Sequence, residues 1–183
     1  MAVSNPLDDE PAGSAAPRVT WIGEGPSFFI QRWDNRNVGE VPIIRVGEVG
    51  RPTLTLQKYA YPAEPLEQLP KPELWIFNAE TGEGYQVDTG EWAHVGNMDL
   101  GGGGIYPSRD GQRVYFARMT RGYGKAELCV VDVSTGEVTV LVQEPTDHAS
   151  SVRFAEFQEI AGGFIWKSDR DGYVHYYHYT SQG

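Results

Sequence analysis

Apolar residues occur along the chain in short runs that are rich in β-branched and aromatic side chains. Runs of this kind predict β-strands. Helical signals are weak, because the best candidate, Ala63–Leu69, is interrupted and flanked by prolines, which break helices. The predicted strands are Phe28–Arg32, Pro42–Val46, Leu54–Tyr59, Leu74–Phe77, Val114–Ala117, Leu128–Val131, Val138–Val142 and Phe164–Trp166.

Glycine-containing turns separate these strands. Each turn places Gly where a tight turn needs a positive φ. Many short strands at close spacing predict an all-β sandwich, barrel or propeller. The turns are Glu80–Glu83, Ser108–Gly111, Ser134–Glu137 and Asp169–Gly172.

An internal repeat favours the propeller. Glu73-Leu-Trp-Ile-Phe-Asn-Ala-Glu-Thr-Gly-Glu83 resembles Glu127-Leu-Cys-Val-Val-Asp-Val-Ser-Thr-Gly-Glu137 at a spacing of 54 residues, and a looser third copy begins 48 residues later at His175. A period near 50 residues is the length of one four-stranded propeller blade.

We therefore predict a partial β-propeller of roughly three to four blades of four-stranded antiparallel sheet. The expected blades cover about 18–90, 91–145 and an incomplete 146–183, after a flexible lead-in over 1–17. Closed propellers have about four to eight blades, so the chain has the character of a fragment.

Composition excludes several classes of protein. The chain has 183 residues and a net charge of -10, which argues against a protein that binds the nucleic-acid backbone. Its single cysteine, Cys129, sits in an apolar run and predicts a buried strand residue, with no intrachain disulfide and no thiolate zinc site. The first 17 residues lack the basic start and apolar core of a signal peptide. The sequence leaves the localisation of the protein undecided between the cytoplasm and the periplasm of a bacterium.

Three segments resemble the propeller of bacterial dipeptidyl-peptidase IV-like serine peptidases, of the prolyl oligopeptidase family. They are Arg32-Trp-Asp-Asn-Arg-Asn-Val-Gly-Glu40, Arg51-Pro-Thr-Leu-Thr-Leu-Gln-Lys-Tyr-Ala-Tyr-Pro62 and Pro72-Glu-Leu-Trp-Ile-Phe77. Trp166-Lys-Ser-Asp-Arg-Asp-Gly-Tyr-Val-His-Tyr-Tyr-His-Tyr179 resembles the family's Trp-x-Ser-Glu-Arg-Asp-Gly-Trp-x-His-Leu-Tyr signature, with Asp169 in place of Glu and Tyr173 in place of Trp. The likeness runs from about Val19 to the end of the chain.

Two parts of the family's machinery are absent from this sequence. The family's nucleophile lies in a Gly-x-Ser-x-Gly elbow of a C-terminal α/β-hydrolase domain, and no such elbow occurs here. The Glu-Glu pair that holds the substrate's amine in the family is also absent. The resemblance therefore implies a non-catalytic propeller portion, whose partners are a hydrolase domain of the same protein and a peptide substrate, with a homodimer as a further expectation. We expect neither a cofactor nor a metal.

Four residues are candidates for contact with substrate or with the hydrolase domain: Arg51, Asp169, Arg170 and His175. Arg51 precedes a proline in the most family-specific segment. Asp169 and Arg170 lie in a charged Asp-Gly turn, where Arg more commonly pins an adjacent strand through charge-assisted bonds. His175 is more commonly a hydrogen-bonded blade residue. His175 and His178 are three apart and point to opposite faces of a strand, which makes a poor metal pair.

Two alternatives remain at this point. One is a stand-alone β-propeller or β-sandwich that binds a peptide or protein partner, for instance by pairing an exposed strand edge with an added strand. The other is the related acylaminoacyl-peptidase type of propeller, against which the Arg51-Pro-Thr-Leu and Tyr61-Pro62 segments favour the dipeptidyl type.

Overall fold

The computed structural model describes residues 18–38, 40–46, 52–58, 69–96, 104–121, 124–144 and 156–183. This part of the chain is all strand and turn, as predicted, and it contains no helix that could span a membrane. The strands are β1 (Val19–Trp21), β2 (Ser27–Asp34), β3 (Glu40–Val46), β4 (Pro52–Lys58), β5 (Lys71–Asn78), β6 (Gly84–Gln86), β7 (His94–Val95), β8 (Ile105–Pro107), β9 (Arg113–Met119), β10 (Ala126–Asp132), β11 (Val138–Glu144), β12 (Glu156–Ile160), β13 (Gly163–Ser168) and β14 (His175–Thr180).

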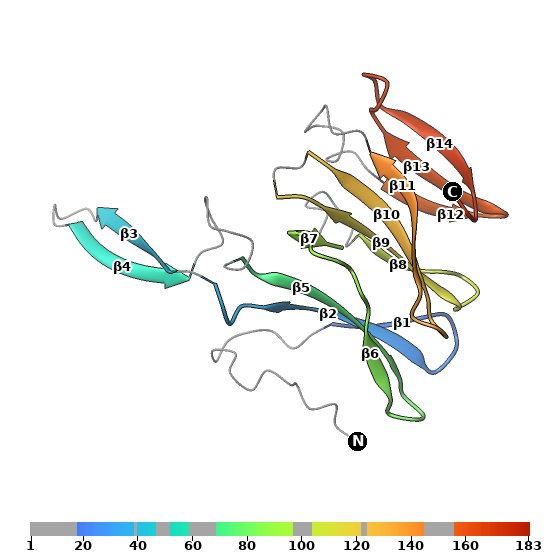
Figure 1. Ribbon diagram of the computed structural model, residues 1–183, viewed down its shortest axis with the longest axis horizontal. Coiled ribbons are helices and arrows are strands. Elements are labelled where there is room, and N and C mark those ends of the chain that lie inside the picture. The colour runs from blue at the N-terminus through green and yellow to red at the C-terminus, as the bar shows by residue number, and fades with distance from the viewer. Residues whose placement is uncertain are drawn as a thin grey trace.

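Three antiparallel sheets follow one another along the chain and lie face to face, from blue to red in Figure 1. The first sheet has the order β1-β2-β5-β6, the second β11-β10-β9-β7 with β8 also on β9, and the third β12-β13-β14. The repeated Glu-Leu segment and its loose third copy form the third strand of each sheet, namely β5, β10 and β14. The repeat thus corresponds to one sheet, and the described chain is a partial β-propeller of consecutive blades.

Two departures from simple four-stranded sheets occur. The first strand position of the second sheet is split into β7 and β8, which pair with different parts of β9. The strands predicted at 42–46 and 54–59 form a separate hairpin, β3–β4, whose described residues end at Lys58 and which projects away from the three sheets (Figure 1). The hairpin interrupts the first sheet between β2 and β5 without joining it.

The second sheet is buried on both faces. Val114 and Phe116 of β9 pack toward the first sheet, whereas the intervening Tyr115 packs toward the third, as the period of two in a strand requires. Cys129 lies fully buried in the first of these two cores, which confirms the prediction of a buried strand residue. Burial raises the pKa of its thiol to about 12, so Cys129 is inert at neutral pH.

The two ends of the sheets differ. The Thr-Gly turns after β5 and β10 lie at the same end as the turn after β1, where the Ala79 amide donates to the Pro26 carbonyl. Gly23 and Gly111 meet at this end, because a Cβ on Gly23 would lie only 2.8 Å from the Gly111 Cα. At the opposite end the chain leaves each sheet and crosses to the next, and we call this the crossover end.

Candidate functional site

Three of the four candidate residues predicted from the sequence lie in the third sheet. Asp169 and Arg170 form the turn between β13 and β14, and His175 opens β14 opposite Ser168 of β13. The fourth candidate, Arg51, lies outside the described residues. The structure therefore gathers Asp169, Arg170 and His175 in one hairpin.

Arg170 is held by a buried carboxylate from the neighbouring sheet. Its Nη2 donates to Oε1 of Glu144 at 2.8 Å, and the Glu144 side chain is fully buried. The same carboxylate accepts hydrogen bonds from Trp166 Nε1 and from Ser168 Oγ, the latter at 2.8 Å. Burial opposes the charge of Arg170, but Glu144 and Tyr179 more than offset it and raise the pKa of its guanidinium. This ion pair links the second sheet to the third.

Two tyrosines complete the surroundings of Arg170. The guanidinium carbon lies 4.5 Å from the ring centroid of Tyr177 and 5.9 Å from that of Tyr179. The Tyr177 hydroxyl donates to Asp171 at 2.6 Å, which ties the turn to β14. The positive charge of Arg170 is thus balanced by Glu144 within the protein. In this geometry the Asp-Arg-Asp-Gly turn has a structural role, because it joins the third sheet to the second.

The histidines of β14 stand apart from this cluster. His175 and His178 are both exposed and lie opposite Ser168 and Ile165, on the two faces of the strand. Within the described ranges, no group of three or more His, Cys, Asp and Glu side chains is placed to hold a metal ion.

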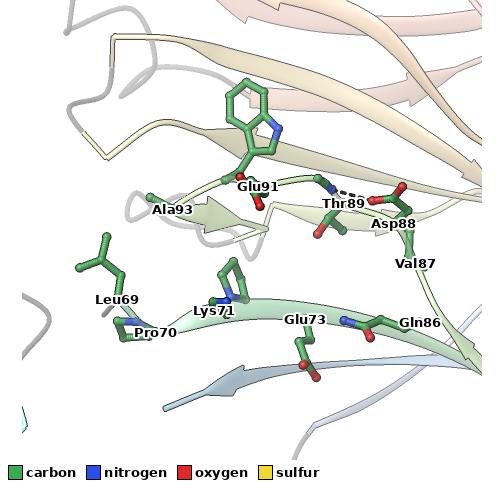
Figure 2. A pocket seen from close by; sticks show the side chains of 13 residues that line it. Leu69, Pro70, Lys71, Glu73, Gln86, Val87, Asp88, Thr89, Glu91 and Ala93 are labelled. Atoms are coloured by element: carbon green, nitrogen blue, oxygen red, sulfur yellow. Dashed lines mark hydrogen bonds between the residues drawn. The ribbon is translucent and has the colours of Figure 1, made fainter. Parts of the chain in front are cut away.

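A feature that sequence reasoning missed is a groove at the crossover end of the first sheet. It lies between the beginning of β5 and the chain that leaves β6, and it has a volume of about 490 Å³ (Figure 2). We call it the β5 groove. The lining residues are 69–73 on one side and 86–93 on the other. The only sequence signal was the polar run after the short strand β6, which by itself is typical of any loop.

One wall of the β5 groove, formed by residues 86–93 and called here the far wall, is fixed to the second sheet. Arg118 of β9 donates from Nη1 to the Thr89 carbonyl at 2.9 Å and from Nη2 to Glu127 at 2.6 Å. The Trp92 ring centroid lies 4.8 Å from the Arg118 guanidinium carbon and 5.1 Å from the Lys125 ammonium nitrogen. Burial works against the charge of Glu127, but its bonds to Lys125 and Arg118 prevail and lower its pKa. These contacts hold the wall in one position.

Comparisons with known proteins agree with this fold. Residues 17–183 match the family described as the dipeptidyl peptidase IV (DPP IV) N-terminal region. No curated protein matches the chain.

Two solved structures are similar to the chain. One is described as a putative dipeptidyl aminopeptidase IV from Bacteroides ovatus, with 22% identity, a TM-score of 0.63, and coverage of 89% of this chain and 22% of that one. The other is Porphyromonas gingivalis dipeptidyl peptidase 4, with 17% identity, a TM-score of 0.63, and coverage of 90% and 23%. The chain therefore spans less than a quarter of either structure, and at these identities the likeness shows the fold alone. Because the family match covers nearly all of the sequence, the chain belongs to the dipeptidyl peptidase IV N-terminal region family.

Proposed function

We propose that this chain is the non-catalytic propeller portion of a dipeptidyl-peptidase IV-like serine exopeptidase, and that it gates and positions peptide substrates for an α/β-hydrolase domain. The observation that carries the proposal is the family match over residues 17–183, joined to consecutive propeller sheets. The parent enzyme would remove dipeptides from peptide N-termini, with Pro or Ala at the penultimate position.

The exposed faces at the two ends of the stack support a larger propeller. On the first sheet Trp21 is 54% exposed, and its ring begins an aromatic row through Phe28 and Phe77 to Trp75. At the third sheet, Tyr176 of β14 is 67% exposed, and Tyr173, in the turn before β14, is 76% exposed. Aromatic faces of this kind are typical of surfaces that pack against a partner, here further sheets of the same protein. In a ring of such sheets, access to the catalytic domain would pass through or around the propeller.

The negative net charge of the chain is consistent with a substrate that enters by its positively charged N-terminal amine. The chain carries a net charge of -10, and an acidic wall in a partly enclosed space attracts a cationic N-terminus. Two of the substrate or domain contacts proposed from the sequence differ in whether they are free to make such a contact. Arg170 is engaged by Glu144, whereas His175 is exposed and open to a neighbouring domain.

The test is reconstitution of peptidase activity. The chain is expressed alone and together with the hydrolase-domain segment encoded by the same gene, and both preparations are assayed with Gly-Pro and Ala-Pro chromogenic amides. We expect turnover only when both segments are present. Turnover by this chain alone would contradict the proposal, because the sequence holds no nucleophile elbow.

Two controls keep the result decisive. Replacing the elbow serine of the hydrolase segment by Ala must abolish the turnover. The complete gene product, expressed as one chain, serves as the positive reference. If that complete protein fails to cleave either amide, the proposed activity is wrong whether or not the two segments reassemble.

A further inference from the structure

We propose that the β5 groove binds an extended peptide segment that carries a basic side chain. The proposal concerns binding at this one site and does not depend on the peptidase activity of any parent enzyme. It rests on three features of the groove: a free strand edge, unmatched carboxylates and a fixed wall.

The free strand edge results from the different lengths of β5 and β6. Pairing of the two strands reaches Trp75 opposite Gln86, and the last bond runs from the Val87 amide to the Leu74 carbonyl at 2.9 Å. Beyond Val87 the chain turns away toward β7. The first residues of β5 therefore pair with β2 on one side and face the groove on the other.

Pro72 is the residue whose backbone faces this groove. In an antiparallel strand, alternate residues direct their backbone groups to opposite neighbours. The Asn78 amide and the Leu74 carbonyl bond toward the β6 side, whereas the Ala79 amide bonds toward β2, so even-numbered residues of β5 face β6. Pro72 thus offers its carbonyl to the groove and has no N–H beside it. An incoming peptide can donate an amide N–H to that carbonyl, as in strand addition.

The unmatched charge in the groove is net negative, because two carboxylates without an ion pair face the single ammonium group of Lys71. Asp88 and Glu91 are exposed on the far wall, and no ion pair joins either of them to a cation within the described part of the chain. Oδ1 of Asp88 accepts the Gly90 amide at 3.0 Å, which fixes that carboxylate in place (Figure 2). Glu73 points away from this wall in Figure 2 and is matched by Arg32 at 2.5 Å.

Two of the three nearby cations are engaged elsewhere. Arg118 and Lys125 bind the carboxylate of Glu127 at 2.6 and 2.8 Å and lie over the Trp92 ring. Lys71 also lines the groove, and no ion pair joins it to a carboxylate within the described part of the chain, so one ammonium group faces the two carboxylates of the other wall. A Lys or Arg side chain of a bound peptide would therefore meet Asp88 and Glu91 without displacing an existing ion pair.

The shape of the groove fits such an occupant. Its volume of about 490 Å³ lies within the range of ordinary ligand sites. Its far wall is held by the Thr89–Arg118 bond and by the cations over Trp92, so little order has to be imposed on binding. A fixed acidic wall facing a strand edge selects an extended segment with a positive charge over a neutral or acidic one.

Fluorescence anisotropy tests the proposal on the full chain. The probes are three end-blocked, fluorescein-labelled peptides, Thr-Val-Thr-X-Thr-Val-Thr, with Lys, norleucine or Glu at X. We expect the Lys peptide to bind most tightly. The double variant Asp88→Asn, Glu91→Gln should weaken its binding roughly tenfold and leave the norleucine peptide unchanged.

A matched control removes the same number of charges elsewhere. Glu80→Gln with Glu83→Gln neutralises two exposed carboxylates on the Thr-Gly turn at the opposite end of the first sheet, and we expect no change in binding. Near-ultraviolet circular dichroism checks that both double variants keep the fold, which their exposed positions favour. Versions of the Lys peptide that are N-methylated at alternate amides should bind more weakly, because methylation removes the donor to Pro72.

Three outcomes would overturn the proposal. The first is no binding of the Lys peptide at about 1 mM, which corresponds to only about 4 kcal/mol of affinity. The second is equal binding of the Lys and Glu peptides. The third is peptide binding that ignores the Asp88 and Glu91 changes while those changes weaken association with the hydrolase segment, in which case the groove is a contact between domains.

Discussion

Arg170 and Glu144 form an ion pair across the boundary between the second and third sheets, with Nη2 and Oε1 2.8 Å apart. The carboxylate is fully buried and the guanidinium largely so, and the two residues stand 26 positions apart in the chain. Because Trp166 and Ser168 bond to the same carboxylate, one side chain collects three donors from the third sheet. A buried carboxylate with this many partners is far more damaging to remove than an exposed one.

We therefore expect Glu144→Ala to destabilise the chain by roughly 3–5 kcal/mol, because it leaves the Arg170 charge buried without its partner. Urea denaturation followed by tryptophan fluorescence measures the change in the free energy of unfolding. Glu83→Ala, in an exposed turn, serves as the control and should change that free energy by less than about 0.5 kcal/mol. Equal effects of the two substitutions would show that the Glu144 cluster does not hold the third sheet.

Arg118 holds the far wall of the β5 groove against the second sheet through both its charge and its geometry. Arg118→Lys keeps the charge but cannot bond Glu127 through two nitrogens and the Thr89 carbonyl at the same time. We expect a loss of roughly 1–3 kcal/mol in the free energy of unfolding. Faster hydrogen exchange should appear in residues 88–92, measured by mass spectrometry, and unchanged exchange there would contradict the fastening.

Gly23 lies where the turn ends of the first and second sheets meet. Its φ is +63°, and an added Cβ would lie 2.8 Å from the Gly111 Cα, which is backbone and cannot rotate away. Gly23→Ala should therefore destabilise the chain by roughly 1–3 kcal/mol. Gly25 is two residues away, and a Cβ there meets nothing within 4 Å. Gly25→Ala should have little effect, and a loss as large as that of Gly23→Ala would rule out the close approach as the cause.

Acid should destabilise the end of β2 through Asp34. Hydrogen bonds from Arg36, which outweigh burial, lower the pKa of Asp34 from 3.8 to about 2. Because the folded pKa is depressed, the contribution of Asp34 is fully present above pH 4 and is lost as the pH falls from about 4 to about 2. Asp34→Asn should lower stability at pH 6 and lose less on acidification than the parent chain. Urea midpoints between pH 6 and 3 compare the two, and parallel curves would contradict the assignment.

Much of the fold could be predicted from local pattern. The runs of β-branched and aromatic residues at Val114–Ala117 and Leu128–Val131 predicted strands that the structure contains, and the Thr-Gly turns are where the repeat placed them. The 54-residue spacing predicted repeated sheets, because each copy must fill the same strand position to bury its apolar side chains. The segments that form the hairpin β3–β4 had the same strand pattern, and no local feature of the sequence indicated that these two strands pair only with each other.

The sequence by itself determined the strands, the turns and the family, since these depend on runs of β-branched and aromatic residues, on glycine's freedom at positive φ and on short motifs. Only the tertiary structure decided which charges meet. Glu144 lies two residues beyond the strand predicted at Val138–Val142, yet the stacking of two sheets places it against Arg170. The β5 groove likewise exists because β6 ends at Gln86 while β5 begins at Lys71, a mismatch in length that only pairing reveals. Contacts between sheets depend on how whole faces pack, and no local pattern carries that information.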